Sequence, residues 1–478
     1  MEALNTSNIE QAYFLGIGGI GMSAIARYLN ASGVRVSGYD KTPSPLTLEL
    51  EAEGIHITYE DSIDSIPAAI AAADSNSLIV LTPAIPADHK QWNYFKAQGR
   101  EILKRSEVLG LISRNAYCIA VAGTHGKTTT STLIAHLLHS CGINFTAFLG
   151  GISSNYNTNY LRKTDGRDLF PGKPTVVLEA DEFDRSFHRL SPDVAVITAA
   201  DPDHLDIYHT HEAFFEAFEV FAQKIVPGGT LVLNTRVNIT PPADIHTCTY
   251  GLETGENAHF SSHFTAVRDG YFYFNYSSRF VEDGVESFRE VTDICAGLPG
   301  FHNIENATAA LGICLDILNL DRFDVKQGIK SFKGVKRRFE YISRSEKGIV
   351  IDDYAHHPQE LSAIISSVRE LYPNRKLTGI FQPHLFTRTR DFAEGFAESL
   401  SKLDSLWLMD IYPARELPLE GITSSWLLEK VSLAEKQLVT EESALQQISD
   451  HAPELLLILG AGDIDRIVPK VKNLYEQN

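Results

Sequence analysis

The sequence predicts an α/β protein built from three consecutive units. Strand-like apolar runs alternate with helical patterns along most of the 478 residues, and this alternation is typical of parallel sheets covered by helices. A buried strand that runs into a glycine or acidic turn begins near Tyr13, near Ile119 and near Ile349. Three units also agree with the length, at roughly 150 residues per domain.

Changes in the pattern place the boundaries of these units. A new strand at residues 117–122 follows a helical stretch at residues 105–112, and a basic stretch at residues 333–338 is typical of a linker. Between them the chain turns β-rich at residues 235–293, which predicts hairpins inserted in the middle unit. The expected units are residues 1–113, 114–335 and 336–478.

Composition excludes several classes of protein. With 44% hydrophobic and 22% charged residues, the chain is typical of a soluble globular protein. Its net charge of −19 argues against nucleic acid, whose backbone needs a basic face. No apolar run is long enough to cross a membrane and no signal peptide is visible, so we expect a cytoplasmic protein without membrane insertion. The five cysteines are widely spaced without a CxxC pair, and we expect reduced thiols.

A glycine-rich turn follows the first strand. Residues 12–17 are apolar and run into the GxGxxG pattern of residues 16–21, which opens a helical pattern. Glycines let backbone amides approach a diphosphate, and a carboxylate after the next strand can accept hydrogen bonds from a ribose. A nicotinamide dinucleotide, a UDP-linked ligand and a turn that binds nothing all remain open. The expected binding residues are Gly16, Gly18, Gly19, Ile20, Gly21 and Asp40.

A second phosphate-binding loop follows the strand at residues 119–122. Residues 123–130 read GTHGKTTT and open a helical pattern. Backbone amides and Lys127 would hold the β- and γ-phosphates of ATP, while the Thr128 hydroxyl would reach Mg²⁺. Val121 stands where the GxxxxGK[ST] pattern has its first glycine, so Gly123 is expected to form the turn. The expected nucleotide-binding residues here are Gly123, Thr124, His125, Gly126, Lys127, Thr128 and Thr129.

Acidic segments after two later strands are the expected partners of the metal ion. Glu179 ends an apolar strand, and His204 lies in the acidic segment after another. A carboxylate is the ordinary ligand of Mg²⁺, and an imidazole is an unusual one. We expect Thr128, Glu179 and His204 to hold the ion.

The chain resembles the Mur ligase family, whose ATP-dependent members add amino acids to the UDP-muramoyl precursor of peptidoglycan. The resemblance extends from about Tyr13 to about Asp463. It rests on the compact loop at residues 123–130, the acidic segments just described and the GxHNxxNA motif at residues 300–307. It implies an N-terminal Rossmann-like domain that binds a UDP-sugar, a central P-loop domain that binds ATP, and a C-terminal Rossmann-like domain that binds the amino acid.

Two C-terminal motifs narrow the resemblance. DDYAHHP at residues 352–358 and FQPHLFTRTRD at residues 381–391 are similar to those of the member that joins L-alanine to UDP-N-acetylmuramate. The usual motif has an arginine where this chain has Leu385, so Arg388 is expected to bind the alanine carboxylate, with help from Arg390 left open. From the residues alone, pairing of these arginines with nearby acids is an equal alternative.

The resemblance also implies a role for each residue. His302, Asn303, Asn306, Arg338 and Asp353 would contact ATP. Tyr354, His356, His384 and Arg388 would surround the alanine. The residues expected to carry the chemistry are Lys127, Glu179, His204, His356, His384 and Arg388.

The implied reaction proceeds through an acyl phosphate. The lactyl carboxylate of UDP-N-acetylmuramate attacks the γ-phosphate of ATP, and the amine of L-alanine then displaces phosphate. Lys127 and Mg²⁺ would offset the repulsion between the anions, and His356 or His384 could take the amine proton. Expected partners are these small molecules, with a monomer or weak homodimer. The alternatives are a ligase that attaches a preformed tripeptide to the same UDP-sugar and a nicotinamide-dependent oxidoreductase.

Overall fold

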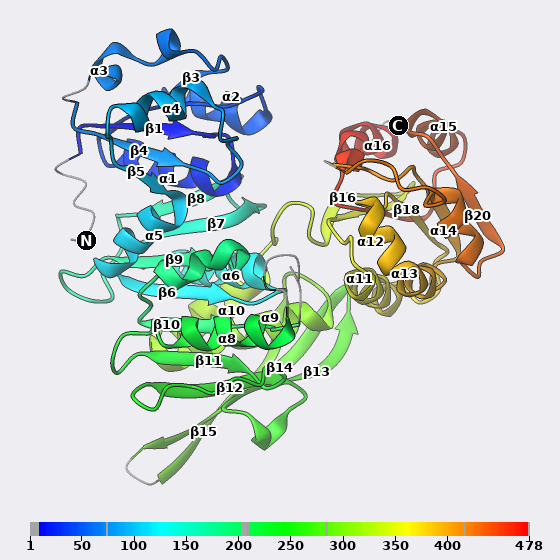
Figure 1. The fold of residues 1–478 in the computed structure, drawn as a ribbon. Helices are drawn as coiled ribbons and strands as arrows, with labels where there is room; N and C mark the ends of the chain where they lie inside the picture. The colour runs from blue at the N-terminus through cyan, green and yellow to red at the C-terminus, as the bar shows by residue number, and fades with distance from the viewer. Residues whose placement is uncertain are drawn as a thin grey trace. The chain divides into compact units, whose positions relative to one another are not determined.

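The computed structural model describes residues 9–72, 75–201, 208, 210–282, 285–414 and 416–476. It confirms the α/β class, with three sheets that are mostly parallel (Figure 1). The chain forms two compact units. Unit 1 comprises Met1–His263, Asn275–Thr292 and Glu305–Ser331, and unit 2 comprises Phe264–Phe274, Asp293–Ile304 and Phe332–Asn478. The domain boundaries expected from the sequence stay predictions.

The first sheet is parallel and has the strand order β3-β2-β1-β4-β5. The central strand β1 is paired on both edges, which is why residues 12–15 are apolar and fully buried. Its strands are β1 (Gln11–Leu15), β2 (Arg35–Tyr39), β3 (His56–Thr58), β4 (Ser77–Leu81) and β5 (Ile102–Lys104). Its helices are α1 (Ile20–Ala31), α2 (Pro45–Ala52), α3 (Ala68–Ala71), α4 (Lys90–Ala97) and α5 (Arg105–Arg114).

The second sheet has ten strands in the order β15-β14-β13-β12-β11-β10-β6-β9-β7-β8. Three long strands, β13 to β15, occupy the end of the region that the sequence predicts to be β-rich. The strands are β6 (Tyr117–Ala122), β7 (Phe145–Ser153), β8 (Thr158–Lys163), β9 (Thr175–Glu179), β10 (Val194–Ile197), β11 (Thr230–Asn234), β12 (His246–Leu252), β13 (Phe260–Arg268), β14 (Tyr271–Glu282) and β15 (Val285–Ala296). The helices are α6 (Lys127–Ser140), α8 (His211–Ala222), α9 (Phe301–Leu311) and α10 (Arg322–Ser331).

The third sheet lies in unit 2 and has the order β16-β17-β21-β18-β19-β20. Only β16 runs antiparallel to its neighbour among the described strands of this sheet. The strands are β16 (Glu340–Ser345), β17 (Gly348–Asp353), β18 (Leu377–Phe381), β19 (Ser405–Leu408), β20 (Glu435–Leu438) and β21 (Leu455–Leu459). The helices are α11 (Pro358–Leu371), α12 (Phe386–Asp391), α13 (Ala393–Leu400), α14 (Ser424–Lys430), α15 (Glu441–Asp450) and α16 (Val468–Glu476).

One continuous apolar core joins the first two sheets of unit 1. Tyr28 on α1 packs edge-on against Phe148 of β7, with ring centroids 5.3 Å apart. The buried Arg27 beside it binds Glu53 and donates to Asn159 Oδ1 of β8 at 2.5 Å. Buried ion pairs are stable only when their polar atoms are hydrogen-bonded. Each of the three guanidinium nitrogens of Arg27 donates to a side-chain oxygen. The glycine turn at residues 16–21 and the loop at residues 123–130 therefore belong to the same compact unit.

No described helix is both long and apolar enough to cross a bilayer. The five cysteines are all free thiols, and Cys118, Cys295 and Cys314 are buried.

Candidate active site

The glycine turn lies at the carboxyl end of β1, between β2 and β4. Parallel α/β sheets bind ligands at such a point, where the strand order reverses. Gly16 has φ +87°, and a Cβ there would lie 2.4 Å from a methyl of Thr82, so no other residue fits without a shift. The amides of Gly16 and Ile17 donate to Tyr39 O at 2.8 and 3.0 Å. Gly19 caps α1, which begins at Ile20.

Asp40 is part of the turn itself in this structure. Its carboxylate accepts from Gly18 N at 2.7 Å and from Lys41 N at 2.7 Å. A Cβ at Gly18 would lie 2.6 Å from a methyl of Thr47 and 2.8 Å from Asp40 Oδ2, so the position favours glycine. Asp40 therefore shapes the turn, and its contact with a ribose stays a prediction.

Arg105 is a cation at this turn that the sequence did not single out. A Cβ at Gly21 would lie 2.3 Å from Arg105 Nη1, so the guanidinium rests against the glycine turn. Its Nη2 also donates to Asp181 Oδ2 at 2.8 Å. Arg105 begins α5, more than 80 positions after the turn in sequence, and no local pattern connects the two. A basic residue where a strand meets a helix was the only available signal.

The second loop has the turn that the sequence assigns to it. Gly123 has φ +132° and Gly126 has φ +81°, whereas Val121 is a fully buried residue of β6. A Cβ at Gly123 would lie 2.2 Å from Thr198 Oγ1. Thr124 N donates to Ala199 O at 3.1 Å, which holds the loop against the end of β10. Lys127, Thr128 and Thr129 then form the first turn of α6, where free amides and the helix dipole favour a phosphate.

Lys127 is held by the loop and by a buried carboxylate. Its Nζ donates to Gly123 O at 2.5 Å and to Glu182 Oε1 at 2.8 Å. Glu182 is only 2% exposed; burial raises its pKa, and the charge of Lys127 opposes that rise. Glu182 lies three residues after Glu179 in the same acidic segment, and its contact with Lys127 could not be predicted from the sequence. The phosphates of a bound nucleotide would therefore share Lys127 with Glu182.

Glu179 has the chemistry of a metal ligand. It ends β9, next to β6, and its Oε2 is buried without a hydrogen-bond partner among the described residues. A Cβ at Gly150 would lie 2.1 Å from that oxygen, so the strand facing it needs glycine. An unpartnered buried carboxylate oxygen fits a hard cation such as Mg²⁺. The other expected ligands are Thr128, which is buried at the start of α6, and His204, which lies outside the described residues. No group of three metal-binding side chains occurs within the described ranges.

The residues of the GxHNxxNA motif divide between the two units. Asn306 lies in unit 1, where its Oδ1 would be 2.5 Å from a Cβ at Gly126. His302 and Asn303 lie in unit 2, and Asn303 Nδ2 donates to Pro299 O at 2.6 Å. Burial lowers the pKa of His302 and raises that of Asp353, and the positive charge of Arg338 acts to lower both pKa values. Four of the residues expected to contact ATP thus lie in unit 2, namely His302, Asn303, Arg338 and Asp353.

Asp353 closes the turn that follows the linker. It ends β17, and its carboxylate accepts from Phe339 N at 2.7 Å and from Ala355 N at 2.8 Å. These bonds orient the chain segment that carries Tyr354 and His356. Asp353 therefore fixes, at the carboxyl end of β17, the start of the segment that carries the residues expected around the alanine.

The residues expected around the amino acid form one cluster in unit 2. The ring centroids of Tyr354 and His356 are 5.2 Å apart, and those of His356 and His384 are 6.0 Å apart. Arg388 Nη1 lies 3.3 Å from His384 Nδ1. Burial, together with the charges of His356 and Arg388, lowers the pKa of His384 to about 4. His384 is thus neutral near pH 7 and able to accept a hydrogen bond.

The arginines of this motif differ in their partners. Arg390 is exposed, and its Nε lies 2.7 Å from Asp391 Oδ1. This is the pairing with a nearby acid that the sequence left open as an alternative. Within the described residues, Arg388 forms no ion pair and contacts only His384 Nδ1 among polar groups. Leu385 has φ +70°, a conformation rare for a residue with a Cβ. Arg388 is therefore the cation available to a carboxylate.

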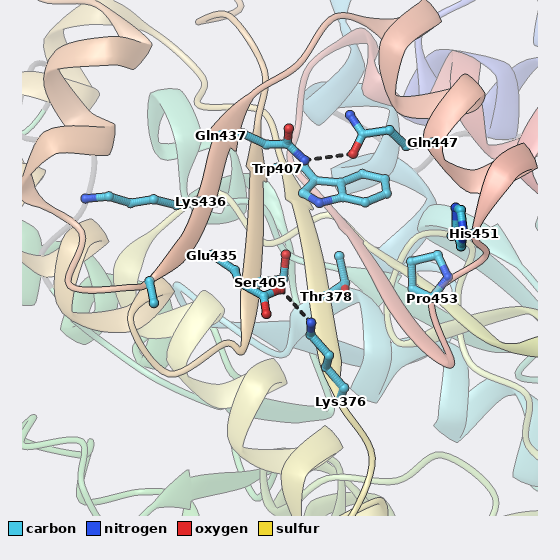
Figure 2. Close-up of a pocket in the computed structure, with 11 residues that line it drawn as sticks. Lys376, Thr378, Ser405, Trp407, Glu435, Lys436, Gln437, Gln447, His451 and Pro453 are labelled. Atoms are coloured by element: carbon cyan, nitrogen blue, oxygen red, sulfur yellow. Dashed lines mark hydrogen bonds and ion pairs between the residues drawn. The ribbon is translucent and has the colours of Figure 1, made fainter.

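A hollow of about 470 Å³ lies elsewhere on the third sheet. Figure 2 shows Lys376, Trp407 and Glu435 among the residues that line it. Lys376 and Glu435 lie at the amino ends of β18 and β20, the edge opposite to the one that carries Asp353 and His384, and Trp407 lies within β19. The hollow is therefore separate from the candidate active site, and its polar groups, such as Lys376 and Glu435, pair with each other.

Two glycine turns at the carboxyl ends of parallel strands, one of them carrying Lys127 and Thr128, define a nucleotide-binding α/β enzyme. Models of three family domains match the chain in order: "Mur ligase family, catalytic domain" at residues 11–117, "Mur ligase middle domain" at residues 121–314 and "Mur ligase, glutamate ligase domain" at residues 337–463. The chain belongs to the Mur ligase family.

Relatives and solved structures agree with this family. The UDP-N-acetylmuramate–L-alanine ligase of Flavobacterium johnsoniae is 45% identical over 99% of this chain and 100% of its own. The enzyme of the same name from Porphyromonas gingivalis is 47% identical over 98% and 99%. The crystal structure of UDP-N-acetylmuramate-alanine ligase from Thermotoga maritima has a TM-score of 0.75 at 26% identity, over 98% of this chain and 99% of that one. A murein peptide ligase from Psychrobacter arcticus, at 20% identity and a TM-score of 0.67, shows the shared fold over 98% and 99%.

Proposed function

We propose that the chain is the ligase that joins L-alanine to the lactyl carboxylate of UDP-N-acetylmuramate, with conversion of ATP to ADP and phosphate, in peptidoglycan precursor synthesis. The observation that carries this function is the identity of 44–48% over nearly the whole chain to enzymes with that name. The tripeptide ligase and the oxidoreductase considered from the sequence receive no comparable support. The ATP loop, built around Lys127, would have no role in the oxidoreductase.

The first chemical step would use the residues of unit 1. The UDP-sugar carboxylate attacks the γ-phosphorus of ATP, a bond forms between that carboxylate oxygen and phosphorus, and the bond from phosphorus to the β,γ-bridging oxygen breaks to release ADP. All these groups are anionic, so positive charge in a site shielded from water is what lowers the barrier. Lys127 and the amides at the start of α6 supply it.

Mg²⁺ would be held by Glu179, Thr128 and His204. When bound it would add positive charge at the reacting phosphate. The fit rests on the unpartnered buried oxygen of Glu179, a hard ligand of the kind that Mg²⁺ prefers.

The second step would use the cluster in unit 2. Arg388 would bind the alanine carboxylate through charge-assisted hydrogen bonds. The alanine nitrogen then attacks the acyl carbon, the bond from that carbon to the phosphate oxygen breaks, and phosphate leaves. His384 and His356, whose rings are in contact, are the candidates to accept the amine proton, and the lowered pKa of His384 makes it the weaker base in the free enzyme. No covalent link to the protein is needed.

A phosphate-release assay with ATP, Mg²⁺ and UDP-N-acetylmuramate, run across the free amino acids, tests this function. We expect release that depends on L-alanine and a product whose mass equals UDP-N-acetylmuramate plus alanine minus water. Release with a tripeptide but not with alanine would contradict the proposal. Size-exclusion chromatography with light scattering would test the expected monomer or weak homodimer.

Lys127→Ala tests the ATP site within the same assay. Removing one preorganised cation from a phosphoryl-transfer site is expected to lower the rate by at least about a hundredfold. Lys224→Ala is the matched control, because Lys224 is an exposed lysine of the same unit. If Lys127→Ala turned over at the rate of the control, the assignment of the ATP site would be wrong.

A further inference from the structure

The helix that carries Arg388 is too short to fix its own position. Helix α12 has only six residues, Phe386–Asp391, and isolated helices of this length are unstable in water. It starts directly after Leu385, whose φ of +70° is unfavourable for a side chain with a Cβ. The position of Arg388 must therefore depend on contacts that α12 makes with other parts of unit 2.

The loop that follows β19 supplies these contacts. Tyr412 N donates to Pro383 O at 2.8 Å, and Leu385 N donates to Tyr412 O at 2.9 Å. The ring of Tyr412 also stacks on His384, with centroids 5.7 Å apart and planes 20° apart. The loop thus pairs with the chain on the entry side of α12, and one of these two hydrogen bonds is made by the strained residue Leu385 itself.

Glu416, in the same loop, binds the first turn of α12. Its Oε2 accepts from Thr387 N at 3.1 Å, and its Oε1 accepts from the Thr387 hydroxyl. The first amides of a helix have no partner within the helix, and a carboxylate is favoured at that end by the helix dipole. These hydrogen bonds outweigh the effect of partial burial and lower the pKa of Glu416, so it stays ionised at neutral pH.

This arrangement also separates the negative charge of Glu416 from Arg388. The carboxylate is occupied by Thr387, one residue before Arg388, and the described residues include no acid that pairs with Arg388. A free carboxylate beside an arginine would compete with a carboxylate ligand for its planar donor pair. Binding to Thr387 keeps Glu416 in place without using that pair.

We propose that Glu416 is a positioning residue for the amino-acid site: it caps α12 through Thr387 and so holds Arg388 beside His384, ready to bind the substrate carboxylate. The inference rests on the proposed function, because it concerns the binding of L-alanine. Glu416 touches neither substrate nor reacting atoms, and its effect passes through Thr387 and Arg388.

The test measures the KM of all three substrates and kcat for Glu416→Ala, Glu416→Gln and Glu420→Ala in the full-length enzyme. Glu420 is the matched control, an exposed acid of the same loop with no hydrogen bond among the described residues. For Glu416→Ala we expect the KM for L-alanine to rise about tenfold, the scale of a lost helix cap, with the KM for ATP and for UDP-N-acetylmuramate unchanged. Glu416→Gln keeps one acceptor oxygen and should recover part of the loss.

Hydrogen exchange of residues 386–391 gives a second measurement that does not depend on activity. Faster exchange in Glu416→Ala than in Glu420→Ala is expected if Glu416 caps α12. The inference is overturned if Glu416→Ala matches Glu420→Ala in both measurements, or if all three KM values rise together. Wild-type enzyme without alanine-dependent phosphate release would instead refute the proposed function, and this inference with it.

Discussion

Arg105 lies where a UDP-linked diphosphate would need a cation. Its guanidinium rests against Gly21 and is anchored from the other side by Asp181. A guanidinium offers a planar pair of donors that suits phosphate oxygens. Because Asp181 follows β9 and its metal-ligand candidate Glu179, Arg105 also connects the glycine turn with the ATP site inside unit 1.

Arg105→Ala should therefore weaken binding of UDP-N-acetylmuramate. We expect its KM to rise at least about tenfold, because a charge-assisted hydrogen bond contributes about 1.5–3 kcal/mol, while the KM for L-alanine stays the same. Arg105→Lys keeps the charge but loses the planar pair of donors, so its KM for UDP-N-acetylmuramate should lie between those of the wild type and Arg105→Ala. Arg114→Ala, at the exposed end of α5, is the control. An unchanged KM for the UDP-sugar would show that Arg105 only pairs with Asp181.

At the level of elements, the linker that enters unit 2 is fixed by Arg337. Arg337 has φ +62°, and its Nη2 donates to Gly460 O at 2.6 Å at the end of β21. Its Nε lies 3.5 Å from Asp352 Oδ2, and its Nη1 lies 3.4 Å from Asp465 Oδ2. One guanidinium thus joins the segment before β16 to the carboxyl ends of β17 and β21. This edge of the sheet also carries Asp353 and the chain that leads to His356.

The buried carboxyl of Asp352 should make the stability of unit 2 depend on pH. Asp352 is 1% exposed, and burial raises its pKa to about 7, opposed by Arg337. The folded state then holds a proton that the unfolded chain releases near its ordinary pKa of 3.8. The contribution of Asp352 is therefore fully present below about pH 4 and is lost as pH rises to about 7, at no more than roughly 1.4 kcal/mol per pH unit.

Urea unfolding at pH 5 and pH 8 measures this effect. We expect Asp352→Asn, which cannot ionise, to lose less stability between these two values than the wild type does. Asp465→Asn is the control, because Asp465 shares Arg337 but is half exposed. A pH dependence of Asp352→Asn equal to that of Asp465→Asn would mean that Asp352 is already ionised at pH 5.

Local patterns predicted the two glycine turns. In both glycine turns, a buried strand, a turn and a helix are adjacent in sequence, so composition and spacing specify them. The cations and acids that complete the site were harder to predict. Glu416 reaches α12 from a loop after another strand, and Arg105 reaches Gly21 from α5. These contacts depend on which strands become neighbours, and a single sequence contains no local signal for that.

A helical pattern also concealed a local irregularity. Apolar residues recur at helical spacing over residues 304–318, but in the structure α9 ends at Leu311 and a wider π-type turn follows at Gly312–Ile317. A Cβ at Gly312 would lie 2.3 Å from the ring of Phe260, so β13 packs against the backbone at this point. Tertiary packing altered the hydrogen-bond pattern there while the apolar spacing stayed helical.

For the molecule as a whole, the net charge of −19 contrasts with substrates that all carry carboxylate or phosphate. Attraction must therefore come from a few local cations. Arg105 rests against Gly21 and Lys127 donates to Gly123 O, and the two cations are held by Asp181 and Glu182 respectively. Those acids keep the cations fixed in place when no substrate is bound. Specific binding then depends on geometry at short range, since a long-range field from this protein repels anions.

The division into two compact units predicts how ligand binding changes thermal unfolding. Chains with several compact units often unfold in more than one transition, and the whole glycine turn lies in unit 1. UDP-N-acetylmuramate at a hundredfold excess over its Kd should stabilise unit 1 by about 2.7 kcal/mol, and should leave the transition of unit 2 unchanged. Calorimetry of the full chain, with hydrogen exchange to assign each transition, measures this. Arg105→Ala should reduce the shift. A shift confined to the transition of residues 340–476 would instead place the UDP-sugar on unit 2, because a ligand stabilises only the unit whose folded state it binds.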